Sequence, residues 1–225
     1  MAFKPAPRIA EPLDASVVAC RFAGLGANLA IEPAPNGPIE ETLVAVSVLG
    51  MEEDDLRLLS LLADWIDHHG AYLYADRLFR CVSRESSVRV RAFWAAIGQQ
   101  DRRLKRLTTL YTGPRLDLLH AATELQVARR GEDPRFAGTP LRVPAGALRK
   151  REGDLLSASA LVAHHAGFRN RVQMGPSCRA DLWTLLEAEP TLTPAEAARR
   201  AGCSFASSWQ AVQDFALWRA GQPSR

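Results

Sequence analysis

Five residues near the carboxyl end are of the types that contact base edges in double-stranded DNA. A glutamine side chain can bind adenine through two hydrogen bonds, serine can bind several bases, and an aromatic ring can contact the thymine methyl group. The five residues are Phe205, Ser207, Ser208, Gln210 and Gln213. No lysine or arginine lies between Gly202 and Arg219, so guanine would lack its commonest partner. The set predicts base reading from a small repertoire, provided that one helix carries all five side chains.

Cations that could hold DNA phosphates lie mostly upstream of this set. Residues 177–225 contain five arginines and five acids, a net charge of zero. Residues 142–171 contain six cations against two acids, a net charge of +4. Because phosphate contacts supply the salt-dependent part of DNA affinity, we expect six residues to bind phosphate: Arg149, Lys150, Arg151, Arg169, Arg171 and Arg179. The alternative is a solvated, charged loop.

Two helix starts separated by a glycine predict the element that presents the base-reading residues. Thr193 can accept a hydrogen bond from the amide of Glu196 while the Glu196 carboxylate reaches back, which is a capping box, and Pro194 suits the first helical position. Gly202 can adopt the left-handed conformation that ends a helix. Ser204 then caps a helix to about Trp218, and a helix over 178–187 comes before both. The alternative is a tight pair of alanine-rich helices inside a bundle.

The motifs of this region resemble those of bacterial regulators. Arg169-Asn-Arg171, the stretch 175–182 (GPSCRADL) and the stretch 197–204 (AARRAGCS) resemble the C-terminal winged-helix or helix-turn-helix part of such proteins. They also resemble regulators that accompany nucleotidyltransferase toxins in abortive-infection systems. The resemblance covers 142–217, about a third of the chain. The resemblance implies a DNA-binding repressor or antitoxin. The helix after Gly202 would read the bases of the DNA.

The sequence departs from that pattern in two places. Ser208 stands where such motifs carry a buried aliphatic side chain. The chain also ends soon after the third helix, so a wing would have to come from 141–148 or from another subunit.

The rest of the chain predicts a mainly α fold with a small β component, in which a helical bundle precedes a winged-helix-like helix-turn-helix domain. Residues 1–50 are rich in proline and alanine, and the β-branched stretches 16–22 and 42–49 indicate two strands. Apolar periodicity predicts helices over about 51–69, 74–82, 87–99, 114–130 and 157–166. The expected domains are 1–50, a helical domain over 51–130, a turn-rich linker or hairpin over 131–156, and the helix-turn-helix domain over 157–225.

Charge is distributed unevenly along the chain. Residues 1–76 carry 4 cations against 12 acids, or −8, and residues 77–225 carry 24 against 13, or +11, which together give +3. The basic segment 77–225 favours a polyanionic partner, although the acidic and basic segments could also attract each other. The basic cluster 102–106 could be a second nucleic-acid surface. A helical bundle that supports dimerisation or a partner is the alternative.

The sequence offers little for catalysis or metal binding. The histidine pairs 68–69 and 164–165 are adjacent, so their rings point about 100° apart on a helix and chelate poorly. We expect these rings to be exposed or at helix ends, and we expect Asp64 and Asp67 to be solvated. The four cysteines are far apart, which favours reduced thiols. We therefore expect no enzyme, catalytic residue, metal or cofactor.

The expected location is the cytoplasm, because the sequence shows no secretion signal and no apolar run near the ~18 residues of a membrane span. The expected partner is double-stranded DNA, with a homodimer as a further expectation and no membrane. The competing hypothesis is a protein-interaction module, such as an antitoxin bound to its toxin or a subunit of a defence complex. Exposed Phe205, Trp209 and Trp218 would favour that hypothesis.

Overall fold

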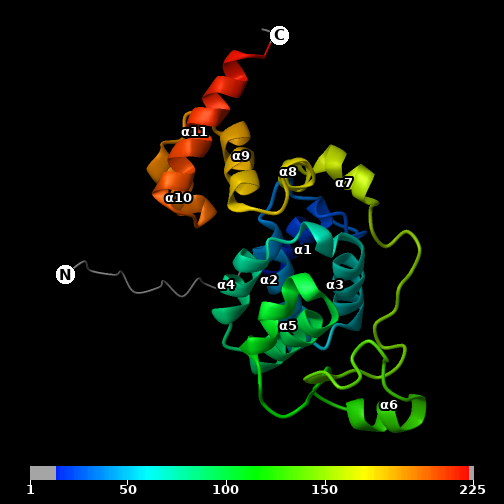
Figure 1. Cartoon of the computed structure of the whole chain (residues 1–225). Helices are drawn as coiled ribbons and strands as arrows, with labels where there is room; N and C mark the ends of the chain where they lie inside the picture. Colours follow the sequence, from blue (N-terminus) through cyan, green and yellow to red (C-terminus); the bar gives the residue numbers. More distant parts are fainter. Residues whose placement is uncertain (1–13, 223–225) are drawn as a thin grey trace, which may run out of the picture.

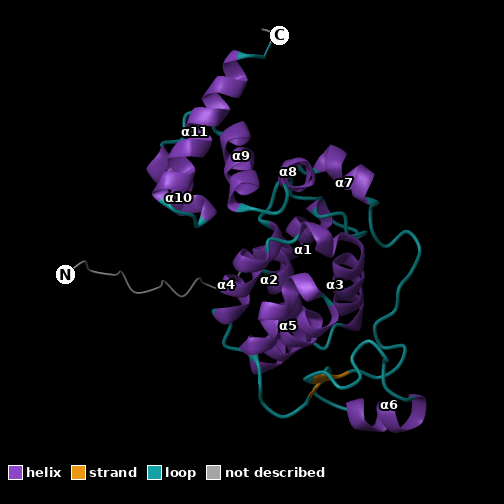
Figure 2. Ribbon diagram, viewed as in Figure 1, coloured by secondary structure: helices purple, strands orange, loops and turns teal. Residues whose placement is uncertain are grey.

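The computed structural model describes residues 14–222 and is mainly helical, with one two-stranded parallel sheet (Figures 1 and 2). The α-helices are α1 (Ala15–Gly24), α2 (Ile39–Glu52), α3 (Leu56–His69), α4 (Ala75–Ser83), α5 (Val88–Gln100), α6 (Thr123–Arg130), α7 (Ala158–His164), α8 (Ala166–Met174), α9 (Cys178–Ala188), α10 (Pro194–Ala201) and α11 (Phe205–Ala220). The short elements are the 3₁₀ helices η1 (Gly70–Tyr72) and η2 (Arg102–Leu110) and the strands β1 (Leu116–Asp117) and β2 (Leu141–Arg142). The predicted α fold is confirmed at this level.

The two stretches predicted as strands are helices, α1 and α2. Asp14 caps α1 by accepting a hydrogen bond from the Ser16 amide at 2.7 Å, and Val18 and Phe22, four residues apart, are both buried. α2 is buried on most of its circumference, so its sequence shows no amphipathic helical period. Burial of these β-branched side chains against neighbouring helices outweighs their weak preference for strands.

The helices α1–α5 pack around the larger of two clusters of buried apolar side chains. Trp65 and Trp94 are fully buried within it, and their indole N–H groups donate to the Leu25 carbonyl and the Ser47 hydroxyl at 2.8 and 3.0 Å. η2 packs closely on α5, because a Cβ at Gly98 would come within 2.8 Å of the Leu104 carbonyl oxygen. This close contact positions the basic cluster 102–106.

The middle of the chain differs from the long helix predicted over 114–130. α6 covers only the end of the expected helix 114–130, because β1 pairs in parallel with β2, and Ala122 takes a left-handed conformation (φ 64°) just before α6. The strand at 141–142 therefore pairs with 116–117 and forms no wing. The sheet lies at the lower end of the molecule in Figure 2, and α10 and α11 lie at the upper end.

The carboxyl-terminal helices α9, α10 and α11 pack around the second cluster of buried apolar side chains, and we call them the three-helix unit. Its core includes Leu182, Leu186, Ala197, Ala201 and Phe215. α8 precedes the unit, and it contacts η1 and α7 as well as α9. The helix positions predicted for 178–187, 193–201 and 204–218 are confirmed to within two residues.

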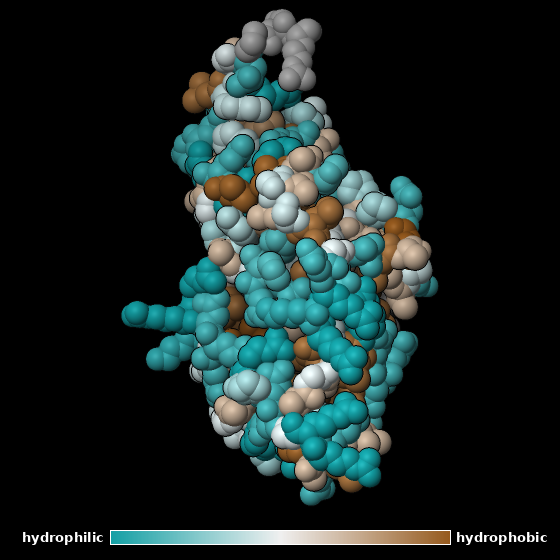
Figure 3. Space-filling model, turned by 90° about the vertical axis from the view of Figure 1, so that its right-hand side faces the viewer, coloured by the Kyte–Doolittle hydropathy of each residue, from teal (hydrophilic) through white to brown (hydrophobic). Residues whose placement is uncertain are grey.

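Within residues 14–222, no helix is both long enough and apolar enough to cross a membrane. Figure 3 shows one face of the molecule, on which brown apolar side chains interrupt the teal polar surface in small separate patches.

Candidate nucleic-acid interface

The turn between α10 and α11 has the local structure that the sequence predicts. The Thr193 hydroxyl accepts from the Glu196 amide at 3.3 Å, and the Glu196 carboxylate accepts from the Thr193 amide at 3.2 Å, which completes the capping box. Gly202 ends α10 in the left-handed conformation (φ 65°, ψ 37°), and the Ser204 hydroxyl accepts from the Ser207 amide at 3.1 Å. Backbone geometry therefore directs α11 away from α10 immediately after residue 202.

Four of the five predicted base-reading residues lie on the exposed part of α11. Phe205, Ser207, Gln210 and Gln213 are exposed, whereas Ser208 is fully buried. Ser208 lies three and seven residues before the buried Ala211 and Phe215, so its side chain belongs to the packed face of the helix. The prediction that Ser208 contacts a base is therefore wrong. Within the described residues its hydroxyl oxygen also has no hydrogen-bond partner.

The exposed face of α11 is unusually apolar. Of the nine large apolar side chains exposed within residues 14–222, four lie on this helix: Phe205 (59%), Trp209 (48%), Leu217 (74%) and Trp218 (45%). The Trp218 ring packs partly against Trp183 and Phe215. The first two residues lie beside Ser207 and Gln210, and the last two lie at the carboxyl end of the helix. α11 thus presents a mixed polar and aromatic first half and an apolar end.

Two of the predicted phosphate-binding arginines are paired within this part of the fold. Arg179 of α9 donates to Asp214 of α11 at 2.7 Å, and Asp214 also accepts from Gln210 at 2.9 Å. Arg169 of α8 donates to Glu187 at 2.8 Å. The hydrogen bond from Gln210 lowers the pKa of Asp214, and the hydrogen bond from Arg179 lowers it further.

Arg171 cannot bind phosphate, because its side chain is only 2% exposed. Its guanidinium donates to both carboxylate oxygens of Glu40, at 2.5 and 2.8 Å, and to Asp181 at 2.8 Å. Arg77 of α4 also reaches Asp181, at 2.8 Å, and Glu41, at 2.9 Å. Burial disfavours the charged forms of both arginines, but the carboxylates outweigh it and raise their pKa. The sequence-based role for Arg171 is therefore wrong.

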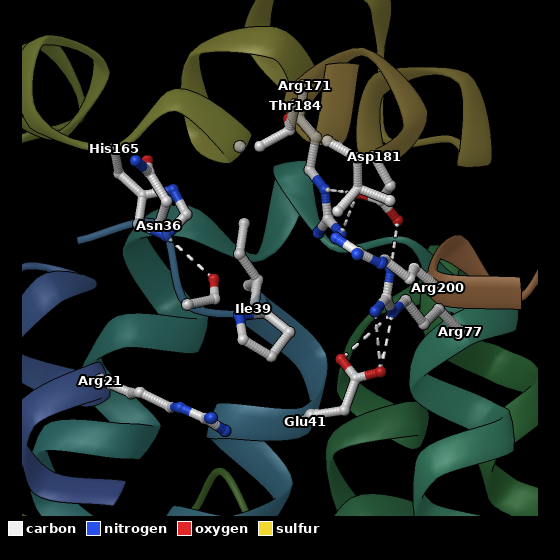
Figure 4. Close-up of a pocket in the computed structure, with 14 residues that line it drawn as sticks. Arg21, Asn36, Ile39, Glu41, Arg77, His165, Arg171, Asp181, Thr184 and Arg200 are labelled. Atoms are coloured by element: carbon white, nitrogen blue, oxygen red, sulfur yellow. Dashed lines mark hydrogen bonds and ion pairs between the residues drawn. The ribbon is translucent and has the colours of Figure 1, made fainter. Parts of the chain in front are cut away.

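This ion cluster (Glu40, Glu41, Arg77, Arg171 and Asp181) joins α2, α4, α8 and α9, and all its members except Glu41 and Arg77 are buried. Figure 4 shows Arg77 between Glu41 and Asp181, with Arg171 above it, along one wall of a cavity of about 430 Å³. Opposite charges that leave water together must be hydrogen-bonded to offset their lost hydration. The cluster meets this condition, and it links the three-helix unit to the helices around the larger core.

The basic stretch 149–151 lies on another side of the molecule from α11. Lys150 Nζ lies 2.7 Å from Asp67 Oδ2 and 3.5 Å from Asp64 Oδ1, both on α3, and the Arg149 amide donates to Ser60 on the same helix. In Figure 1 α3 lies on the right and α10 and α11 lie at the upper left. The structure therefore does not bring Arg149, Lys150 and Arg151 together with the predicted base-reading residues.

The expectation that Asp64 is solvated is wrong, whereas the expected position of the histidines is confirmed, because His68 and His164 are exposed, His69 ends α3 and His165 is the N-cap of α8. His69 and His165 are 2% and 1% exposed, and Asp64 is 5% exposed, so these side chains are not solvated. His165 caps α8, because its Nδ1 accepts from the Phe168 amide at 3.0 Å while Nε2 lies 3.1 Å from the Gly37 carbonyl. Burial lowers the pKa of His165 to about 4. In each histidine pair one ring is exposed and the other is buried. The sequence does not indicate which one is buried, because neighbouring positions point in different directions.

Sequence reasoning missed one arginine beside the turn. Arg80 Nη2, from α4, lies 3.8 Å from the position that a Cβ would take at Gly202. Only tertiary packing brings residue 80 to residue 202. The basic cluster 102–106 could have drawn attention to this region, because η2 packs against α4.

Within the described residues, no group of three or more histidine, cysteine, aspartate or glutamate side chains could hold a metal ion. Comparison of the chain with known protein families, with curated proteins and with solved structures finds no match.

Proposed function

We propose that the chain is a DNA-binding regulator that reads the major groove with the first half of α11, in the manner of a helix-turn-helix. One observation carries the proposal: α10 and α11 are joined by a doubly capped turn, and the first half of α11 is exposed. In such motifs the second helix lies in the major groove with its first residues against base edges. Phe205, Ser207, Gln210 and Gln213 would be the residues that read bases.

The chemistry of these side chains favours sites rich in A·T pairs. Gln210 and Gln213 can bind adenine, and Phe205 can contact thymine methyl groups, while no guanine-binding cation lies on this part of α11. Gln210 must release its hydrogen bond to Asp214 to use its amide donor, so Gln213 is expected to contribute more. Repression of transcription is the regulatory outcome that the proposal favours.

Fluorescence anisotropy with labelled duplexes from around the protein's own gene tests this function. The double variant Gln210→Ala/Gln213→Ala should lose preference between duplexes, by about 1–3 kcal/mol for each lost bidentate contact, while it keeps salt-dependent binding. Gln126→Ala on α6 is the matched control, because α6 lies at the opposite end of the molecule from α11. Base reading is excluded if the double variant discriminates between duplexes as well as the wild type does.

A protein-interaction role is the second candidate, and the exposure of Leu217 and Trp218 at the carboxyl end of α11 favours it. Apolar side chains gathered at one end of a helix suit contact with another protein, either a second copy or a toxin-like or defence-complex partner. Light scattering after size-exclusion chromatography tests the homodimer. Leu217→Glu should dissociate it, and a wild-type chain that stays monomeric at high concentration would leave only the other partners.

A further inference from the structure

We infer that α4 and η2 supply the phosphate contacts of the proposed DNA complex, so that the duplex lies across both the α10–α11 turn and α4. This inference rests on the proposed function, because it names the surface that holds the DNA backbone. In this inference the α4 and η2 cations take the phosphate-binding role that the sequence suggested for 149–151, which lie against α3. The cations concerned are Arg80, Arg84, Arg102 and Lys105, which we call the α4–η2 surface.

The net charges of the two regions show which one can hold a polyanion. Residues 177–222 contain four arginines and five acids, which gives a net charge of −1. Residues 75–110, which contain α4, α5 and η2, carry nine cations against Asp76, Glu85 and Asp101, a net charge of +6. Affinity for DNA needs cations at several phosphates. The three-helix unit has no net positive charge to contribute, whereas the adjoining segment has.

The packing of α4 brings one of these cations to the turn. Arg77 is tied to Asp181 of α9, and Arg80 follows one helical turn later, 3.8 Å from the open side of Gly202. Figure 1 shows α4 below α10 and to its right, and the approach of Arg80 to Gly202 joins the two. In a helix-turn-helix complex the second helix enters the major groove while the first helix crosses the DNA backbone, so the turn that follows the first helix lies near phosphates. Arg80 is therefore placed where a phosphate would come.

The other cations extend the same surface away from the turn. Arg84 is the C-cap of α4, one turn beyond Arg80, and η2 packs against α4, with the Arg106 guanidinium 4.0 Å from the centre of the Phe79 ring. Arg103 and Arg106 are paired with Asp101 and Asp76. Within residues 14–222, none of the four cations of the α4–η2 surface forms a salt bridge. Their charges remain available to a ligand.

Charge removal on the full-length chain tests the surface. The test variant is Arg80→Gln/Arg84→Gln/Lys105→Gln, and the control is Arg130→Gln/Arg149→Gln/Arg151→Gln, which also removes three charges and includes two arginines that the sequence suggested for phosphate binding. Anisotropy titrations are run from 50 to 300 mM KCl with a preferred and an unrelated duplex. Circular dichroism melting checks that both variants are folded.

The expected result is specific to the test variant. Its affinity for both duplexes falls roughly tenfold or more at 100 mM salt, and its log–log salt slope decreases by about 2 to 3, while the control stays within about twofold of wild type. Equal binding by the test variant and wild type, or a larger loss in the control, overturns the inference and leaves the proposed function intact. If the wild type retains neither duplex at low salt, the proposed function fails, and this inference fails with it.

Discussion

Arg171 in α8 donates two hydrogen bonds, 2.5 and 2.8 Å long, to the two carboxylate oxygens of Glu40 in α2, and both side chains are almost completely buried. The two residues lie 131 positions apart in the chain. Glu40 also accepts from the Tyr74 amide, and Arg171 donates to the Tyr72 carbonyl. This pair therefore links α8, which precedes the three-helix unit, to α2 in the larger core.

Arg171→Met should destabilise the protein by about 3–5 kcal/mol, because it leaves the Glu40 and Asp181 carboxylates buried with fewer partners. Urea unfolding followed by tryptophan fluorescence measures the change. Arg169→Met, two residues earlier and paired with Glu187 near the surface, should cost at most about 1 kcal/mol. Similar losses in the two variants would show that the buried pair has no special weight.

Thr193→Ala should destabilise the three-helix unit by about 1 kcal/mol, because the Glu196 amide at the start of α10 loses its acceptor. Thr193→Ser keeps the hydroxyl and should unfold near the wild-type midpoint. Thermal unfolding by circular dichroism compares the two variants. Indistinguishable midpoints for Ala and Ser would contradict a stabilising cap at this position.

The free energy of unfolding should decrease as the pH is lowered through the range set by His165, because burial lowers the pKa of this residue from 6.5 to about 4. Between these values the unfolded chain binds a proton that the folded chain excludes, so stability decreases as pH falls from about 6.5 towards 4. The full effect is about 3 kcal/mol. Protonation of Nδ1 would also remove the acceptor for the Phe168 amide.

The variant His165→Asn isolates this contribution from the titration of the carboxylates. Its stability deficit relative to wild type should shrink by about 2 kcal/mol between pH 7.5 and pH 5, since the wild type alone loses the His165 contribution. His164→Asn, which changes the exposed neighbouring ring, is the control. A deficit that stays constant with pH would contradict a buried neutral His165.

Two cysteines should react slowly with iodoacetamide in the folded protein. Burial raises the pKa of Cys81 to about 12, with a further rise from Glu41 and Glu40, and burial raises the pKa of Cys203 to about 11. Because only the thiolate reacts, alkylation at pH 8 should be about 100-fold slower at Cys203 and about 1,000-fold slower at Cys81 than in the urea-unfolded chain. Mass spectrometry of peptides after timed quenching measures each rate. Rates unchanged by unfolding would contradict the environments described.

The capping box of α10, the glycine that ends it and the cap of α11 could be predicted because each of these interactions joins residues at most five positions apart. The same holds for the predominance of helix, which follows from apolar periodicity and from local caps such as Asp55 and Ser87. Tertiary structure decided the properties that depend on distant neighbours. These include the helical state of 16–22 and 42–49, the burial of Ser208, the pairing of Arg171 with Glu40, and the approach of Arg80 to Gly202. A side chain's burial and its charge partner are set by segments far away in the chain, and no local pattern records which segments those will be.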